Sequence, residues 1–166
     1  GGLAHVAGGI HVAAGSGQQV LAVDDVTLDV AAGEVVGIAG PNGAGKTTMI
    51  AMLLGFLRPT AGTITIAGQE PRRYVEQHGV AYLPELMALM KTWRVDGALR
   101  RLATLDGVAA DRVDAEVDRV IGLLEIGEHR RKRVKALSKG NFQRVGLAQA
   151  LLRGHDVVVF DEPTHG

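Results

Sequence analysis

Short apolar stretches of strand length recur along the chain. Val26, Leu28 and Val30 alternate with polar residues, which predicts a strand with one buried face, and residues 31–34 predict the turn that ends it. Four further segments have the length and composition of strands, namely 35–39, 63–68, 79–83 and 157–160.

Longer segments carry the repeat expected of helices. Residues 49–57 form an apolar stretch of helical length that ends before Arg58 and Pro59. From about residue 84 to 153 the pattern is mostly helical, and between 113 and 124 one face is apolar while Asp, Glu and Arg occupy the other. Strands and helices in this order predict an α/β core interrupted by a helical insertion.

Composition narrows the function classes. A chain of 166 residues is long enough for one domain. Its 18 basic and 18 acidic residues cancel, so no overall charge draws it to nucleic acid or to an acidic membrane. It has no cysteine, which excludes disulfides and thiolate chemistry, and no apolar stretch long enough to span a bilayer. Because it begins with Gly1, we expect the start to have been processed or cut.

The stretch GPNGAGKTT contains a phosphate-binding pattern: Gly40, four residues, and then Gly45, Lys46 and Thr47. Glycines let backbone N–H groups turn towards the phosphates of a nucleotide. Lys46 supplies a positive charge for the β- and γ-phosphates, Thr47 offers a hydroxyl to Mg²⁺, and the following helix points its positive end at the anion. An ordinary glycine turn is the alternative, and the expected strand before and helix after the pattern argue against it.

The last strand runs into Asp161 and Glu162. A carboxylate at the end of a buried strand beside a phosphate loop can hold Mg²⁺, which we assign to Asp161. Glu162 then stands where a base could align an attacking water. Many strands end in a carboxylate, so this pattern is weak by itself.

Residues 137–152, LSKGNFQRVGLAQALL, predict a helix that Ser138 caps and at whose start Gly140 lets a ligand approach the backbone. The N-terminus of this helix is a second candidate anion site. A capped amphipathic helix without a ligand is the alternative.

Together these motifs resemble the nucleotide-binding domain of ATP-binding cassette (ABC) transporters, a P-loop NTPase. GPNGAGKTT is similar to its Walker A loop, VVVFDEPT to its Walker B strand, and LSKGN to its LSGGQ signature, with Lys139 and Asn141 as departures. The resemblance implies an α/β P-loop core with an N-terminal antiparallel β-subdomain and a helical insertion that carries the signature. We expect one domain, 1–166, with the β-subdomain and core at about 1–83 and 154–166 and the helical subdomain at about 84–153.

The resemblance implies an ATPase that binds ATP and Mg²⁺ and works as a dimer, with each nucleotide held between the Walker motifs of one copy and the signature of the other. Lys46 and Glu162 would be catalytic, and Thr47, Asp161 and Glu85 would meet the metal. Glu85 falls where the family has its Q-loop glutamine, and a carboxylate there cannot donate as an amide does. Nucleotide contacts would come from Gly40, Pro41, Asn42, Gly43, Ala44, Gly45, Lys46, Thr47, Thr48, Ser138 and Gly140.

Two further departures concern the base and the C-terminus. The family stacks adenine on an aromatic residue, but none occurs before Phe56; the corresponding place falls at 13–17, and His11 is the conceivable substitute. The family's D-loop and switch histidine do not follow the Walker B run, so we expect a domain truncated after it and interpret His165 as a loop residue.

Three functions follow. The first is the ATPase subunit of a transporter, and the motifs YLPE and LSKGN favour an export-type system. This subunit would be cytoplasmic and peripheral on the inner face of the membrane, where it would contact a transmembrane permease subunit. The second is a non-transport ABC ATPase acting on nucleic acid or the ribosome. The third is a nucleotide-binding module without turnover, which we expect of the 166 residues alone.

We interpret the basic run 130–133 as a solvated face and Trp93 as partial core in preference to binding roles.

Overall fold

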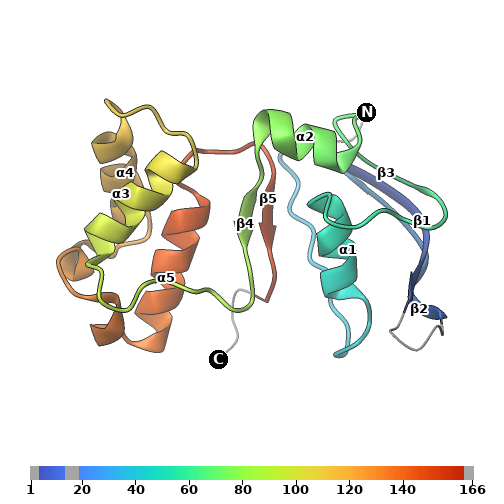
Figure 1. Cartoon of the computed structure of the whole chain (residues 1–166), viewed down its shortest axis with the longest axis horizontal. Coiled ribbons are helices and arrows are strands. Elements are labelled where there is room, and N and C mark those ends of the chain that lie inside the picture. The colour runs from blue at the N-terminus through green and yellow to red at the C-terminus, as the bar shows by residue number, and fades with distance from the viewer. Residues whose placement is uncertain (1–3, 14–18, 163–166) are drawn as a thin grey trace. The chain divides into compact units, whose positions relative to one another are not determined.

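The structure is a computed structural model that describes residues 4–13 and 19–162, and it divides between Gly79 and Val80 into two units (Figure 1). We call them the N-terminal unit and the C-terminal unit. Each combines strands with helices, which confirms the predicted α/β class.

The N-terminal unit is built on a three-stranded antiparallel sheet. Its strands are β1 (Ala4–Ala13), β2 (Gln19–Val30) and β3 (Thr63–Ile66), in the order β2-β1-β3. The strand predicted at 26–30 is therefore confirmed as part of β2, and the one predicted at 63–68 is confirmed over 63–66, since residues 67 and 68 turn the chain. The turn predicted at 31–34 is also present, with the N–H of Glu34 donating to the carbonyl of Ala31 at 3.1 Å.

Two helices complete this unit: α1 (Lys46–Leu53) and α2 (Pro71–His78). α1 packs on the sheet through a small core in which all members are apolar: Val23, Met49, Met52 and Ile64, with Val26, Leu28 and Leu53 at its edge. α2 starts with a proline, whose fixed φ suits the first helical position, and is followed by Gly79 at positive φ.

Two sequence predictions in this unit were wrong. Residues 35–39 do not form a strand; Val35 is 96% exposed, and no strand of the described chain pairs with the segment. A strand must pair its backbone polar groups with a neighbour, and an apolar run alone does not supply one. The helix predicted at 49–57 runs from Lys46 to Leu53 instead, because Gly55 adopts a left-handed conformation (φ 75°) that closes its C-terminal turn.

The C-terminal unit consists of a pair of parallel strands and three packed helices. β4 (Ala81–Leu83) and β5 (Val158–Phe160) are parallel, which confirms the strands predicted at 79–83 and 157–160. Between them lie α3 (Val95–Leu105), α4 (Val113–Leu123) and α5 (Lys139–Ala150). Two short 3₁₀ turns, η1 (Gly127–His129) and η2 (Val134–Ala136), connect α4 to α5.

The helices of this unit bury their apolar faces against one another. Val113, Val117, Val120 and Ile121 are all buried, as the helical repeat predicts. They join one core cluster whose other members are Val95, Leu99, Ala103, Val108, Ile126, Val145, Ala148 and Leu152. This core gives α5 a fixed support, and α5 begins at the proposed signature motif.

Candidate functional site

The phosphate-binding loop lies in the N-terminal unit and leads directly into α1. Two of its glycines have left-handed backbones, Gly43 with φ 86° and Gly45 with φ 85°. Gly45 is the N-cap of α1, and a Cβ on it would overlap the carbonyl oxygen of Ala22 and lie 2.9 Å from Cγ2 of Val23. Only glycine therefore allows the loop to approach β2 this closely while turning into the helix.

Lys46 closes the loop on itself. Its Nζ donates to the carbonyl oxygen of Gly40 at 2.7 Å and lies 3.2 Å from that of Pro41, and the N–H of Ala44 donates to Pro41 at 3.1 Å. The ammonium group is thus held over the concave backbone, where a bound phosphate would meet it.

The remaining loop residues are open to solvent. Residues 40–44 and Thr47 are exposed, and Thr48 is half-buried. The first turn of α1 contains no acidic residue, and the positive dipole end of the helix adjoins the loop. The geometry and donors of the loop fit a polyphosphate.

Asp161 and Glu162 follow β5 in the C-terminal unit. The N–H of Asp161 donates to the carbonyl of Leu83 at 2.9 Å, extending the β4–β5 pairing by one step, and the residue is only 5% exposed. Glu162 has a left-handed backbone (φ 47°), which is unfavourable for a residue with a side chain and turns the chain sharply after the strand. A hard cation such as Mg²⁺ suits an oxygen ligand at this position.

Tyr82 reports the electrostatic surroundings of Asp161. Burial raises the pKa of the Tyr82 phenol above its ordinary value, and the negative charge of Asp161 raises it further. The raised pKa keeps the Tyr82 phenol neutral at neutral pH.

A pocket of about 250 Å³ joins three residues that the sequence singled out separately. Glu85, Lys139 and Glu162 all line it. The other lining residues come from β4, the segment after it and α5: Leu83, Pro84, Leu86, Met87, Phe142 and Gln143. The proposed catalytic carboxylate and the residue at the Q-loop position therefore face one cavity. No group of three or more His, Asp or Glu side chains in the described part of the chain converges as a complete metal site.

The start of α5 has the geometry predicted for it. The Oγ of Ser138 accepts a hydrogen bond from the N–H of Asn141 at 3.3 Å, so Ser138 is the N-cap. Gly140 is exposed, and a Cβ on it would meet no atom within 4 Å. Farther along, Gly146 allows close packing, because a Cβ there would lie 3.0 Å from Leu83 and closer still to Met87.

The structure describes the site in two halves, since the phosphate-binding loop belongs to the N-terminal unit and the other candidates to the C-terminal unit. The roles assigned to individual residues remain predictions. The side chain of His11, residues 14–17 of the proposed adenine-binding region and His165 lie outside the described residues.

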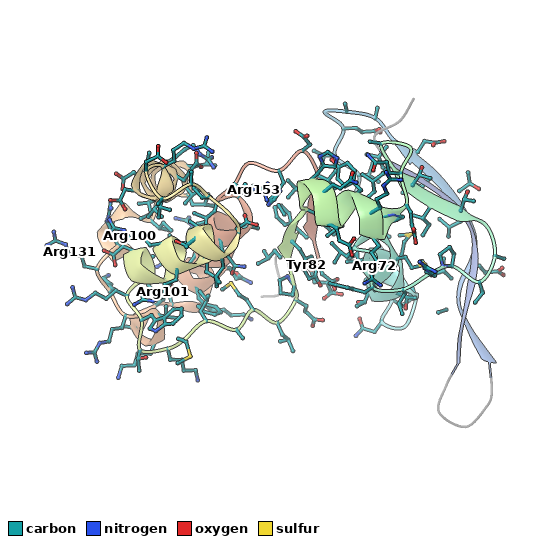
Figure 2. All side chains as sticks on the ribbon, turned by 45° about the horizontal axis from the view of Figure 1, so that its top comes forward. Arg72, Tyr82, Arg100, Arg101, Arg131 and Arg153 are labelled. Atoms are coloured by element: carbon teal, nitrogen blue, oxygen red, sulfur yellow. The ribbon has the colours of Figure 1, made fainter. Side chains whose placement is uncertain are left out.

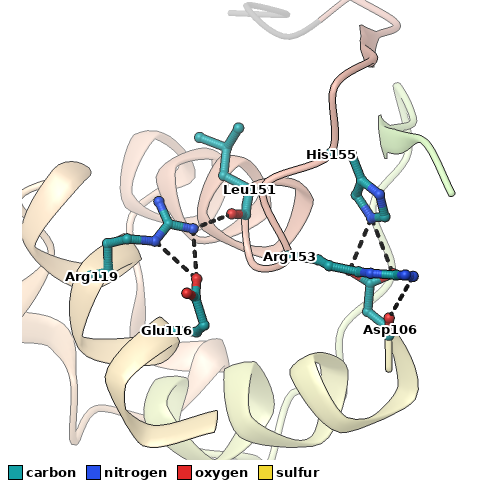
Figure 3. A network of polar contacts seen from close by, with 6 residues as sticks. All are labelled: Asp106, Glu116, Arg119, Leu151, Arg153 and His155. Carbon is teal, nitrogen blue, oxygen red and sulfur yellow. Dashed lines mark hydrogen bonds and ion pairs between the residues drawn. The ribbon is translucent and has the colours of Figure 1, made fainter. Parts of the chain in front are cut away.

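Sequence reasoning missed a polar network around the C-terminus of α3 (Figure 3). The Nε2 of His155 lies 3.2 Å from an oxygen of Asp106, and Arg153 donates to the carbonyl of Asp106 at 3.2 Å. The His155 side chain is only 3% exposed. This network ties α3 to the segment that leads into β5 and so helps to position Asp161. The only signal in the sequence was a histidine shortly before the last strand.

A second part of the network joins α4 to the end of α5. Arg119 donates to the carbonyl oxygen of Leu151 at 2.6 Å and forms an ion pair with Glu116 at 2.8 Å (Figure 3).

None of the helices in the described ranges has the length and hydropathy of a membrane span.

Comparisons with known proteins agree with the motifs. Residues 23–165 match the family model described as ABC transporter. The ABC transporter ATP-binding protein NatA of Bacillus subtilis is 36% identical over 89% of this chain and 61% of its own length. The Nod factor export ATP-binding protein I of Paraburkholderia xenovorans is 38% identical over 87% and 48%. The taurine import ATP-binding protein TauB of a Jannaschia species is 33% identical over 89% and 54%.

Solved structures show the same fold. The dimeric ABC transporter cassette MJ0796 matches with a TM-score of 0.80 at 19% identity, covering 97% of this chain and 74% of its own. The cbiO1 protein of Clostridium perfringens, part of the transporter complex cbiONQ, matches with a TM-score of 0.81 at 24% identity, covering 99% and 66%. The chain spans roughly half to three fifths of the length of the curated relatives described above. On the family match, the chain belongs to the ABC transporter family.

Proposed function

We propose that the protein to which this chain belongs binds and hydrolyses ATP to power a membrane transporter. The observation that carries the proposal is the loop of residues 40–47, in which glycine geometry, the Lys46 ammonium and the start of α1 converge on one concave backbone. This arrangement suits the triphosphate of a nucleotide better than any uncharged ligand.

The loop would hold the nucleotide through its backbone and through Lys46. Backbone N–H groups of the loop, other than at Pro41, which has none, would bind phosphate oxygens, and Lys46 would leave the carbonyl oxygens of Gly40 and Pro41 to neutralise the β- and γ-phosphates. The Thr47 hydroxyl would ligate Mg²⁺. When bound, Mg²⁺ would neutralise charge that develops on the phosphates.

The C-terminal unit supplies the groups for hydrolysis. Asp161 would hold the metal, and Glu162 would accept a proton from the attacking water. Glu85 faces the same pocket as Glu162, which favours a role for it near the metal. Ser138 and Gly140, at the exposed start of α5, would complete the nucleotide site of a second copy.

The proposed assembly is a dimer of ATP-binding domains attached to a transmembrane permease subunit, on the inner face of the cell membrane. The similarity to the dimeric MJ0796 cassette supports the dimer, and the similarity to cbiO1, a part of the cbiONQ transporter complex, supports the attachment. Residues 1–166 would form one domain, with the helical subdomain at about 84–153 set into the core. We propose an export-type system; the relatives include an importer and an exporter, so this direction rests on the YLPE and LSKGN motifs.

Nucleotide binding to the full chain tests the proposal. A fluorescent ATP analogue is titrated with Mg²⁺ into the chain and into two variants, Lys46→Ala and Lys91→Ala. Lys91 is an exposed lysine outside the loop and serves as the control. We expect Lys46→Ala to weaken binding at least about tenfold, since it removes a charge-assisted contact, and Lys91→Ala to leave it unchanged. Equal affinities for the two variants would refute the assignment of the loop.

Turnover is tested separately, with Glu162→Gln in the same chain. If the parent hydrolyses ATP, this variant should bind it and lose hydrolysis, since the amide cannot accept the proton. Hydrolysis that persists in Glu162→Gln would remove Glu162 from its proposed role without affecting that of Lys46.

A further inference from the structure

Two basic stretches that are far apart in the sequence lie side by side in the C-terminal unit. Residues 91–95 run antiparallel to residues 132–135, with the N–H of Lys135 donating to the carbonyl of Lys91 at 3.1 Å. The N–H of Val134 donates to Trp93 at 2.9 Å, and Arg94 and Arg133 form a bridge pair. This backbone pairing fixes the position of both stretches.

The pairing gathers exposed positive charge in these two stretches and beside them, and we call this set of residues the basic face. Its members are all exposed: Lys91, Arg94, Arg101, Arg131, Lys132, Arg133 and Lys135. Figure 2 shows nitrogen-tipped side chains at the end of the C-terminal unit that carries Arg101 and Arg131. The net charge of the whole chain, which is zero, conceals this local excess.

The cations of the basic face are not paired with carboxylates of the described residues. Other arginines of the helical region have acidic partners, such as Arg100 with Asp114 at 3.1 Å and Arg130 with Asp118 at 2.6 Å. Among the residues that the structure describes, no ion pair to a carboxylate joins any of the seven cations. Arg94 and Arg133 also lie directly opposite each other, an arrangement of like charges that costs stability. A bound anionic surface would relieve this repulsion.

Apolar side chains lie next to the basic face. The guanidinium of Arg101 lies 4.8 Å from the ring centroid of Trp93, which is half-buried. Met90 immediately precedes Lys91 and is 57% exposed. Tryptophan and exposed aliphatic residues beside clustered lysine and arginine form the combination that attaches proteins to the interface of an anionic bilayer.

We propose that the basic face binds the anionic phospholipid headgroups of the membrane on which the transporter works. This inference rests on the proposed function for the presence of that membrane, but not on any contact with nucleotide. Clusters of about four to eight lysines and arginines bind anionic leaflets, and seven are present here. Nucleic acid fits less well, because Arg101 already covers the ring of Trp93 beside the basic face, which would otherwise be available for stacking on a base.

Vesicle binding tests the proposal. The full chain is mixed with vesicles of phosphatidylcholine alone or with added phosphatidylglycerol, and the bound fraction is measured by flotation at several salt concentrations. The test variant carries Arg131→Gln, Arg133→Gln and Lys135→Gln. The control carries Arg72→Gln, Arg73→Gln and Arg112→Gln, which removes the same charge from exposed positions outside the basic face.

We expect binding only to the vesicles that contain phosphatidylglycerol, weakening as salt rises. The test variant should bind on the order of a hundredfold more weakly, from about fivefold for each lost charge, and the control should bind as the parent does. All substituted residues are exposed, so both variants should fold, and circular dichroism verifies this.

Three results would overturn the proposal. The first is no binding to either kind of vesicle, and the second is equal binding to vesicles by the test and control variants. The third is a test variant that no longer binds duplex RNA but still binds vesicles as the parent does. ATP binding is measured on the same preparations. If the chain still binds ATP, any of these results would reject only the proposal that the basic face binds lipid. If the chain does not bind ATP, the proposed function is rejected.

Discussion

Replacing Gly45 with alanine should destabilise the phosphate-binding loop much more than the same replacement at Gly43. The two glycines make a matched pair, because their φ angles are 85° and 86°. They differ in their surroundings: a Cβ on Gly45 would overlap the Ala22 carbonyl, whereas a Cβ on Gly43 would meet nothing within 4 Å. Any difference between the variants therefore measures the close approach to β2 and not the backbone conformation.

The expected sizes follow from three contributions. A residue with a side chain in the left-handed region costs about 1–2 kcal/mol, and replacing glycine with alanine returns about 0.4–1 kcal/mol by restricting the unfolded chain. Gly43→Ala should thus cost about 1.6 kcal/mol or less. The overlap at Gly45 adds about 1–3 kcal/mol of overpacking, so Gly45→Ala should cost roughly 1–5 kcal/mol, and the difference between the two variants should be about 1–3 kcal/mol.

Urea unfolding followed by circular dichroism measures both values, and amide exchange locates the loss. The midpoint for Gly45→Ala should fall well below that for Gly43→Ala with the same slope, and exchange should accelerate in β2 and α1. Equal losses, or a larger loss for Gly43→Ala, would refute the claim that contact with β2 requires glycine at position 45.

Three further predictions concern the C-terminal unit. Leu99→Ala should cost about 2–5 kcal/mol because Leu99 is fully buried, whereas Leu105→Ala, at an 83% exposed position, should change the free energy of unfolding by less than about 0.5 kcal/mol in urea titrations. Ser138→Ala should cost about 0.5–1 kcal/mol by removing the cap of α5, and aspartate at this position should restore thermal stability. Asp161→Asn should lower the pKa of Tyr82 in an ultraviolet titration of the metal-free chain but leave it above the ordinary value, because burial is the larger cause. Since the folded state keeps the Tyr82 proton at pH values where the unfolded chain loses it, this phenol lowers stability as pH rises above about 10.

Local patterns predicted the elements that depend on nearby residues. The apolar repeat located α4, and the cap rule located α5 at Ser138. The phosphate-binding loop was recognisable because its glycines are demanded by its own backbone geometry. Each of these signals acts over one or two helical turns.

Other features depend on residues distant in sequence, and the sequence did not reveal them. α2 was missed because its eight residues are strongly polar, and only Pro71 and Tyr74 are buried. Residues 35–39 have the composition of a strand but no paired neighbour in the structure. The contact between His155 and Asp106 joins positions 49 residues apart, and no repeat or motif announces it.

The hydrogen bonds of Lys46 change how substitutions at this position should be interpreted. The ammonium group donates hydrogen bonds to the carbonyl oxygens of Gly40 and Pro41, so it holds the loop backbone in the conformation that a phosphate would need. Binding of a phosphate therefore exchanges one set of partners for another, and part of the conformational entropy is lost before the ligand arrives. A variant without this ammonium would give up charge and preorganisation together, and its measured affinity would report the sum of the two.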